Sequence, residues 1–185
     1  MNKKVVLIFI LFIYSIYLPA SENQNYEYSH FFSLGGWFGG DKIATNPGGD
    51  NYNAGSGGII EFGHAYKLRK VINIFHRNSL ALRYQGAKEG DGENRGFVVE
   101  STLVKEWKKI AVGGGVHLDL FNRVKDQYGD SIELNNIIGT VVNLEYLFNE
   151  KAGVGIRYLF ADFESKEGTI YKGNQFGFFV SVRYE

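Results

Sequence analysis

The chain has 185 residues, with 20 Lys and Arg against 20 Asp and Glu, and it contains no Cys. The length allows one ordinary domain, and the even charge gives no indication of a nucleic-acid partner. The lack of Cys excludes a disulfide framework, a Cys-based zinc site and a lipoprotein Cys anchor. The 24 Gly, 12 Tyr and 15 Phe fit closely spaced β-strands better than helices.

The first residues have the order of an export signal. Lys3 and Lys4 precede an apolar run over 5–18, and a polar stretch follows Ala20. This order predicts a secretory signal peptide cleaved after Ala20. The alternative is an uncleaved anchor, for which the run is short, since a spanning helix needs about 20 apolar residues. The expected division is a signal peptide over 1–20, a short polar segment over 21–30 and one β-barrel domain over 31–185.

The remainder of the chain alternates between apolar and other residues and sustains no 3.6-residue stripe. Eight strands are predicted, over 31–39, 57–68, 79–87, 96–107, 110–121, 136–148, 152–163 and 175–184. Their lengths of about 9 to 13 residues exceed the five or six that are typical of globular strands. A tilted strand needs about 9–11 residues to cross a bilayer, so the lengths indicate lipid.

The predicted connections differ in length from one end of the strands to the other. Four are long and polar, over 40–56, 88–95, 122–135 and 164–174, whereas those over 108–109 and 149–151 are tight turns. The connection predicted over 69–78 is an exception, because it is longer and partly apolar. Long loops at one end and short turns at the other are typical of an outer-membrane barrel.

The predicted strands have one large, mostly apolar face, which in the last strand is wholly apolar. The last strand places Phe176, Phe178, Val180, Val182 and Tyr184 on one face and Arg183 on the other. A charged residue at the lipid midplane costs about 2–4 kcal/mol, so charges avoid a lipid-facing surface. We therefore expect the apolar faces to meet lipid and the small and charged residues to fill a narrow lumen.

The predicted lumen set is close to neutral. It contains Glu61, Lys67, Arg83, Glu100, Glu106, His117, Asp119, Glu145, Arg157 and Arg183. Because buried charges must be paired, this set predicts a network of ion pairs inside the barrel. A soluble barrel with these charges in water is the alternative.

Aromatic residues recur at both ends of the predicted strands. A girdle at the periplasmic interface is predicted from Tyr66, Trp107, Tyr146, Phe148 and Tyr184, and an upper rim from Phe38, Phe62, Tyr84, Phe97, Phe160 and Phe176. Two residues do not fit. His64 falls on the lipid face unless a β-bulge after Gly63 turns it inward. Trp37 falls on the lumen side, where it is expected to fill space beside Gly35 and Gly39.

The chain resembles the small eight-stranded outer-membrane β-barrels of Gram-negative bacteria, the class that includes the OmpA transmembrane domain and OmpX. The resemblance covers about residues 26–185, and its most specific element is the last strand with its terminal aromatic Tyr184, which Glu185 follows as a departure. It implies an all-β, eight-stranded antiparallel up-and-down transmembrane barrel in the outer membrane. It also implies that the barrel assembly machinery reads the last strand.

The leading functional expectation is a non-enzymatic protein whose long loops contact an extracellular partner or which supports the envelope. A general diffusion pore is not expected, because side chains nearly fill an eight-stranded barrel. No cofactor is expected. Loop 40–56 is rich in Asn and Asp and would suit Ca²⁺, but it lacks the EF-hand spacing, and turn chemistry explains these residues equally well.

Two alternatives remain at this point. The first is an enzyme that hydrolyses or transfers acyl chains of lipid A, for which a nucleophile, a His base and an acid are needed. His117 and Asp119 share the lumen face, where the upper parts of the adjacent predicted strands offer Glu100, Thr102 and Gly139 but no serine, so a structural role for His117 is favoured. The motif of His76 to Ser79 differs in order from that of a deacylase. The second alternative is a soluble lipocalin-like barrel with an apolar ligand cavity.

Overall fold

The computed structural model describes residues 28–38, 42–45, 51–53, 56–69, 73–86, 93–125, 131–133, 135–164 and 170–184. The predicted signal peptide, its cleavage site and most of the Asn- and Asp-rich loop lie outside these residues. The described residues form twelve β-strands. No helix in these ranges is long and apolar enough to cross a membrane.

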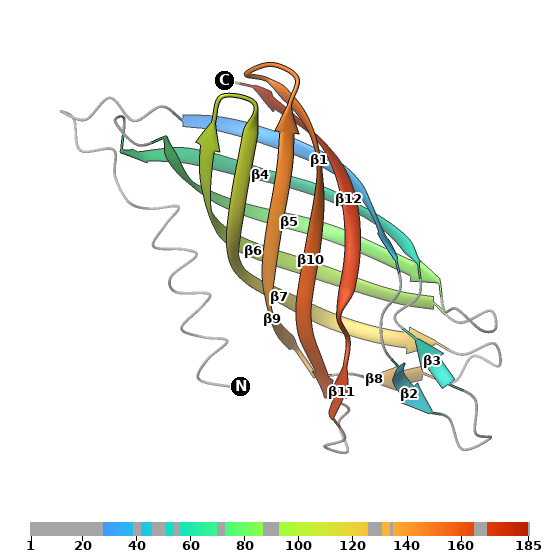
Figure 1. Ribbon diagram of the computed structural model, residues 1–185. Coiled ribbons are helices and arrows are strands. Elements are labelled where there is room, and N and C mark those ends of the chain that lie inside the picture. Colours follow the sequence, from blue (N-terminus) through green and yellow to red (C-terminus); the bar gives the residue numbers. More distant parts are fainter. Residues whose placement is uncertain are drawn as a thin grey trace.

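Eight of the strands are long: β1 (Tyr28–Phe38), β4 (Gly57–Arg69), β5 (Ile74–Gly86), β6 (Glu93–Trp107), β7 (Ile110–Lys125), β9 (Ile137–Leu147), β10 (Ala152–Glu164) and β12 (Gln175–Tyr184). Each pairs antiparallel with the next in this order, and β12 also pairs with β1. The sheet is therefore a closed up-and-down barrel (Figure 1), and the predicted fold class is confirmed.

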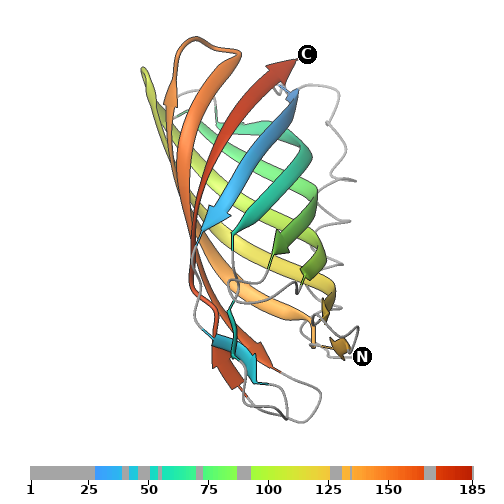
Figure 2. The ribbon, with the colours of Figure 1, turned by 90° about the vertical axis from the view of Figure 1, so that its right-hand side faces the viewer.

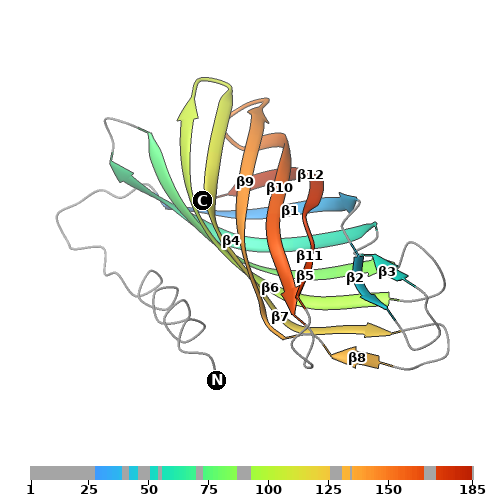
Figure 3. The ribbon, with the colours of Figure 1, turned by 60° about the horizontal axis from the view of Figure 1, so that its bottom comes forward.

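Four short strands lie at one end of the barrel (Figure 1 and Figure 3): β2 (Lys42–Thr45), β3 (Asn51–Asn53), β8 (Ser131–Glu133) and β11 (Ile170–Lys172). β2 and β3 form a hairpin, β8 pairs with the end of β7, and β11 pairs with the end of β10. The β8 and β11 pairings extend the barrel wall beyond its rim, whereas β2 and β3 form a separate two-stranded sheet. We call this end the loop end. The opposite end, where β12 terminates, is the turn end.

The strands are staggered around the barrel, as the tilted ribbons of Figure 2 show. One row of paired residues begins at Tyr184 in β12 and passes through His30, His64, Asn78, Ser101, Val116, Thr140 and Phe160. Tyr184 lies at the turn end of its strand, whereas Phe160 lies towards the loop end of β10. A row of paired residues thus shifts from the turn end towards the loop end as it is followed around the barrel. This shift is the stagger that a closed barrel of tilted strands requires.

The predicted connection over 69–78 is wrong. β4 continues to Arg69 and β5 begins at Ile74, so only residues 70–73 connect them. Residues His76 to Asn78 are polar on both faces, so the start of β5 shows no alternation of apolar and polar residues. All connections described at this end are therefore short, as in an outer-membrane barrel.

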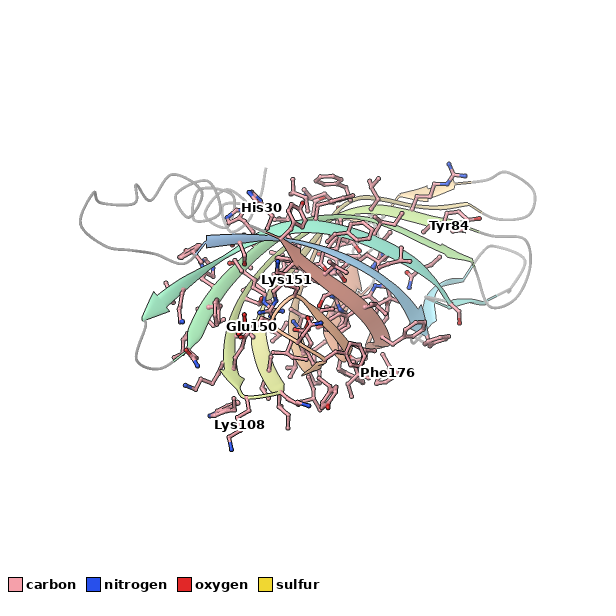
Figure 4. All side chains as sticks on the ribbon, turned by 90° about the horizontal axis from the view of Figure 1, so that it is seen from above. His30, Tyr84, Lys108, Glu150, Lys151 and Phe176 are labelled. Atoms are coloured by element: carbon pink, nitrogen blue, oxygen red, sulfur yellow. The ribbon has the colours of Figure 1, made fainter. Side chains whose placement is uncertain are left out.

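The two faces of the wall differ as predicted. In β12, Phe176, Phe178 and Val180 are 44 to 47% exposed, whereas Phe179 and Ser181 are 2 and 3% exposed. β9 shows the same alternation along its whole length. The outer surface is thus a continuous apolar wall, and Figure 4 shows the side chains that it carries. An apolar surface of this extent is stable in lipid rather than in water.

Large apolar side chains enter the barrel beside glycines. Trp37 is fully buried and faces Gly177 across the β1–β12 pairing. A Cβ atom at Gly177 would lie 2.8 Å from Trp37 Cε3, and one at Gly155 would lie 2.5 Å from Phe179 Cζ. The lumen position predicted for Trp37 is confirmed. The space that it occupies, however, lies over Gly177 across the ladder rather than over Gly35 in its own strand, and Gly39 lies outside the described residues.

Candidate functional site

The charged side chains of the lumen form three clusters from the turn end to the loop end, and the last two share Glu100. At the turn end, Arg77 Nη1 lies 2.9 Å from Glu145 Oε2, and Arg77 Nη2 lies 3.2 Å from Glu106 Oε1. Arg183 contacts the same two carboxylates, at 2.7 Å from Glu106 and 3.6 Å from Glu145. Ser181 donates a further hydrogen bond to Glu145. Two arginines thus share two carboxylates contributed by β6 and β9.

The middle cluster is centred on Arg157 of β10. Its Nη2 lies 2.8 Å from Glu61 Oε2, and its Nη1 lies 3.5 Å from Glu100 Oε2. Ser79 Oγ donates to Glu61 at 2.5 Å. The guanidinium also stacks 4.6 Å from the centroid of Phe179. Arg157 therefore joins strands on opposite sides of the barrel, because β10 does not pair with β4 or β6.

The cluster nearest the loop end is built around His117, which is fully buried. Its Nδ1 lies 2.7 Å from Glu100 Oε1, and its Nε2 lies 3.9 Å from Asp119 Oδ2. Asp119 is also paired with Arg83. Since Glu100 belongs to the middle cluster as well, charge contacts run from Arg83 to Glu61 across the lumen.

The eight residues predicted for the lumen charge network all take part in these clusters: Glu61, Arg83, Glu100, His117, Asp119, Glu145, Arg157 and Arg183. Arg77 was not predicted to lie in the lumen, because it fell in the connection predicted over 69–78. Continuing the alternation of β5 back from Ser79 places Arg77 on the inner face. Lys67, also predicted for the lumen, lies at the turn-end mouth with its Nζ 5.7 Å from the Phe75 ring.

Little space remains among the clusters. A cavity of about 20 Å³ lies between Phe31, Arg77, Glu100, Arg157 and Phe179. This volume holds about one water molecule. The barrel is thus packed with side chains at this level, as expected for eight strands.

The turn-end mouth is a wider space of about 700 Å³. Its charged lining residues are Lys67, Glu106, Lys108, Lys109, Glu150, Lys151 and Arg183. Figure 4 labels three of these residues, Lys108, Glu150 and Lys151. Lys108 adopts a left-handed φ of 49° in the tight turn between β6 and β7.

Four of the five residues predicted for the aromatic girdle project outwards near the turn end. Trp107, Tyr146, Phe148 and Tyr184 are 46 to 57% exposed. Tyr66 also lies on the outer face, but it is half-buried and hydrogen bonded to His76 Nδ1. The placement agrees with an interfacial band, and its role in anchoring the barrel remains a prediction.

The outer face near the turn end also carries a polar group of residues. His64 lies on this face, and the pairing of β4 with both neighbours is regular on either side of it. The bulge suggested after Gly63 is therefore wrong. Asn78 Nδ2 lies 3.5 Å from His64 Nε2, and His76 Nε2 lies 2.8 Å from Ser101 Oγ. These contacts pair several of the polar side chains, which lowers the cost of placing them against lipid, although Asn78 Oδ1 has no hydrogen-bond partner among the residues that the structure describes.

The arrangement around His117 does not support acyl chemistry. Its ring nitrogens face two carboxylates, and no hydroxyl is hydrogen bonded to it among the described residues. A serine hydrolase requires the His base within reach of its nucleophile. The same part of the chain contains no group of three or more His, Cys, Asp and Glu residues that would hold a metal ion. Within these residues His117 belongs to the ion-pair network.

The lipocalin-like alternative does not fit either. It places the bulky apolar faces inside around a ligand cavity, whereas here they are exposed outside and the lumen holds charges. Phe176, Phe178, Val180, Val182 and Tyr184 all face outwards and are 44 to 50% exposed.

No protein-family model matches the chain, and no curated protein sequence matches it. Solved structures are nevertheless similar to it. Neisserial surface protein A (NspA) is 11% identical, with a TM-score of 0.54 over 85% of this chain and 97% of that one. Ail, the attachment invasion locus protein of Yersinia pestis, is 14% identical, with a TM-score of 0.54 over 85% of this chain and 99% of that one. A second Ail structure, in complex with the heparin analogue sucrose octasulfate, has a TM-score of 0.52 at 13% identity.

At these identities the comparisons establish the fold alone. The chain aligns with 97% of the NspA chain and 99% of the Ail chain. Its own barrel is closed, apolar on the outside and charged in the lumen. The resemblance to small eight-stranded outer-membrane β-barrels of Gram-negative bacteria is confirmed, and the chain has the fold of that class.

Proposed function

We propose that the chain is a non-enzymatic outer-membrane protein that supports the envelope and presents its loop end to partners outside the cell. The observation that carries this proposal is the combination of an apolar outer wall with a lumen closed by ion pairs. A barrel of this kind is inserted in lipid and carries no general solute traffic.

The loop end is the surface for recognition. The added strands β8 and β11 extend the wall there, and β2 of the separate β2–β3 hairpin contacts β11. The Ail structure with sucrose octasulfate shows a barrel of this fold with a sulfated ligand. An extracellular partner for this chain is part of the proposal, and its chemistry is left to experiment.

The proposal also covers the export of the chain and its assembly in the outer membrane. The signal peptide over 1–20 directs secretion, and the last strand, from Phe176 to Tyr184, is read by the barrel assembly machinery. The outward apolar face of this strand supports that role, because a regular aromatic and aliphatic row is available along its full length.

Fractionation with a heat-modifiability gel tests the location. The full chain is expressed in a Gram-negative host, the membranes are separated, and boiled and unboiled samples are compared. We expect recovery in the outer membrane and a band that shifts on boiling. A water-soluble periplasmic protein without a shift would refute the proposal.

A lipid assay tests the absence of enzymatic activity. Lipid A and phospholipids are extracted from hosts that express the wild type, His117→Ala or His76→Ala, and their acyl chains are compared. The second variant covers the His76–Ser101 contact on the outer face. We expect identical lipids in all three. Acyl loss that depends on either histidine would show that the chain is an enzyme.

A further inference from the structure

The outer wall has an apolar groove near the loop end. It has a volume of about 680 Å³ and crosses β1, β4, β5 and β6. Its side-chain walls are formed by Leu34, Ile60, Leu82, Tyr84, Arg95 and Phe97. This volume is within the range of about 300–1,000 Å³ that is typical of small-molecule sites.

A glycine opens the groove. Gly58 lies on the outer face between Gly36 and Tyr84 in the strand pairing. A Cβ atom at Gly58 would meet only the carbonyl oxygen of Gly35, at 3.8 Å. At the neighbouring Gly36 the space is already filled, because a Cβ there would lie 2.8 Å from Phe178 Cε1. The backbone of β4 is therefore uncovered at Gly58, whereas Phe178 covers Gly36 and the paired Tyr84 carries a large side chain.

A cation stands at the loop-end edge of this groove. The Arg95 guanidinium lies over the Tyr84 ring, 5.6 Å from its centroid, and Arg95 is exposed. Tyr84 and Arg95 are paired residues close to the loop ends of β5 and β6. In outer-membrane barrels the longer loops are extracellular, so this edge lies at the level of the outer-leaflet headgroups.

We propose that this groove is a binding site for one phosphorylated lipid of the outer leaflet. An acyl chain lies over Gly58 between Leu34, Ile60 and Leu82, and the lipid phosphate meets Arg95. The apolar lining suits a hydrocarbon chain, and the planar guanidinium suits the oxygens of a phosphate. Stacking on Tyr84 holds the guanidinium at the edge of the groove.

The proposal rests on the outer-membrane location above, but the two are tested separately. Fractionation reports the location, whereas lipid binding is measured on the purified full chain in detergent micelles. Native mass spectrometry of the chain titrated with lipid A gives the number of lipids bound and the dissociation constant. We expect one saturable lipid A per chain.

Matched variants isolate the groove. Gly58→Phe fills it from a position with open space, and Gly114→Phe makes the same change on the outer face of β7, where a Cβ would be in ordinary contact at 3.6 Å. Arg95→Gln removes the cation, and Lys105→Gln removes a cation that lies over Trp107 at the other end of β6. We expect at least tenfold weaker lipid A binding for Gly58→Phe and Arg95→Gln, with Gly114→Phe and Lys105→Gln unchanged.

Each variant is first shown to be folded by its unboiled band. If Gly58→Phe or Arg95→Gln fails to fold, Gly58→Leu or Arg95→Met replaces it, and weakened lipid A binding is expected in either case. Equal binding by the Gly58 and Gly114 variants would overturn the proposal. Displacement of lipid A by millimolar inorganic phosphate would also overturn it, and so would equally tight binding of dioleoylphosphatidylcholine. A third contrary result would be a groove variant that changes only the dimer content of the protein and not its lipid A binding.

Discussion

Replacing Arg157 by Met tests whether the lumen charges act as one paired network. Arg157 is 4% exposed and neutralises two carboxylates that are equally buried, Glu61 and Glu100. Breaking a buried ion pair by removal of one partner costs about 3–5 kcal/mol. Glu61 keeps its bond from Ser79, and Glu100 keeps its contact with His117. We therefore expect the free energy of unfolding to fall by about 3 kcal/mol, the lower limit of that range.

The assay is a urea titration of the refolded barrel in lipid vesicles, with the folded fraction read from the unboiled band. The exposed Lys151→Met serves as the control, because surface changes away from special features alter stability by about 0.5 kcal/mol or less. The triple variant with Arg157→Met, Glu61→Gln and Glu100→Gln removes the charges together. It is expected to be more stable than Arg157→Met alone, since the two carboxylates that Arg157 neutralises are removed with it. A loss below about 1 kcal/mol for the single variant, or a less stable triple variant, would refute the reasoning.

Three other predictions concern the wall. Gly177→Ala places a Cβ 2.8 Å from Trp37 and 2.9 Å from a carbonyl oxygen, so we expect a loss of about 1–3 kcal/mol, whereas Gly58→Ala, in open space, is expected to be close to neutral in the same urea titration. Ile156→Arg, in the middle of β10 on the outer face, is expected to cost about 2–4 kcal/mol, against about 0–1 kcal/mol for Phe148→Arg at the interface; equal costs would contradict a lipid-facing wall. Tyr184→Asp is expected to reduce the folded band recovered from outer membranes, while the purified chain still refolds in detergent; unchanged recovery would show that the terminal aromatic is not read during assembly.

The strands and their faces could be predicted from the sequence because both depend on neighbouring residues. A period of two places Val180 outside and Ser181 inside whatever the rest of the chain does. The start of β5 was not found, because His76, Arg77 and Asn78 are polar on both faces and so carry no apolar alternation. Arg77, which pairs with two carboxylates, lies in this stretch and was therefore not predicted for the lumen.

The pairing of the charges could not be predicted, although the charged residues themselves were found. Arg157 on β10 meets Glu61 on β4, and these strands are not neighbours in the sheet. Such a contact depends on the stagger of the barrel, which brings distant levels of different strands together. Stagger is a property of the closed sheet, and no single strand encodes it. The apolar groove could not be predicted for the same reason. Gly58 lies beside Gly36 and Tyr84 only because of the register of the paired strands.

The pairing of β1 with β12 has a consequence for how the chain folds. His30 pairs with Tyr184, so the contact that closes the cylinder joins nearly the two ends of the described chain. Contacts between such distant residues form slowly, because a long loop must be ordered first. Until synthesis is complete, β1 has an exposed edge with unpaired backbone groups that would pair with other chains. A nascent barrel of this topology therefore needs its first strand shielded until its last strand arrives.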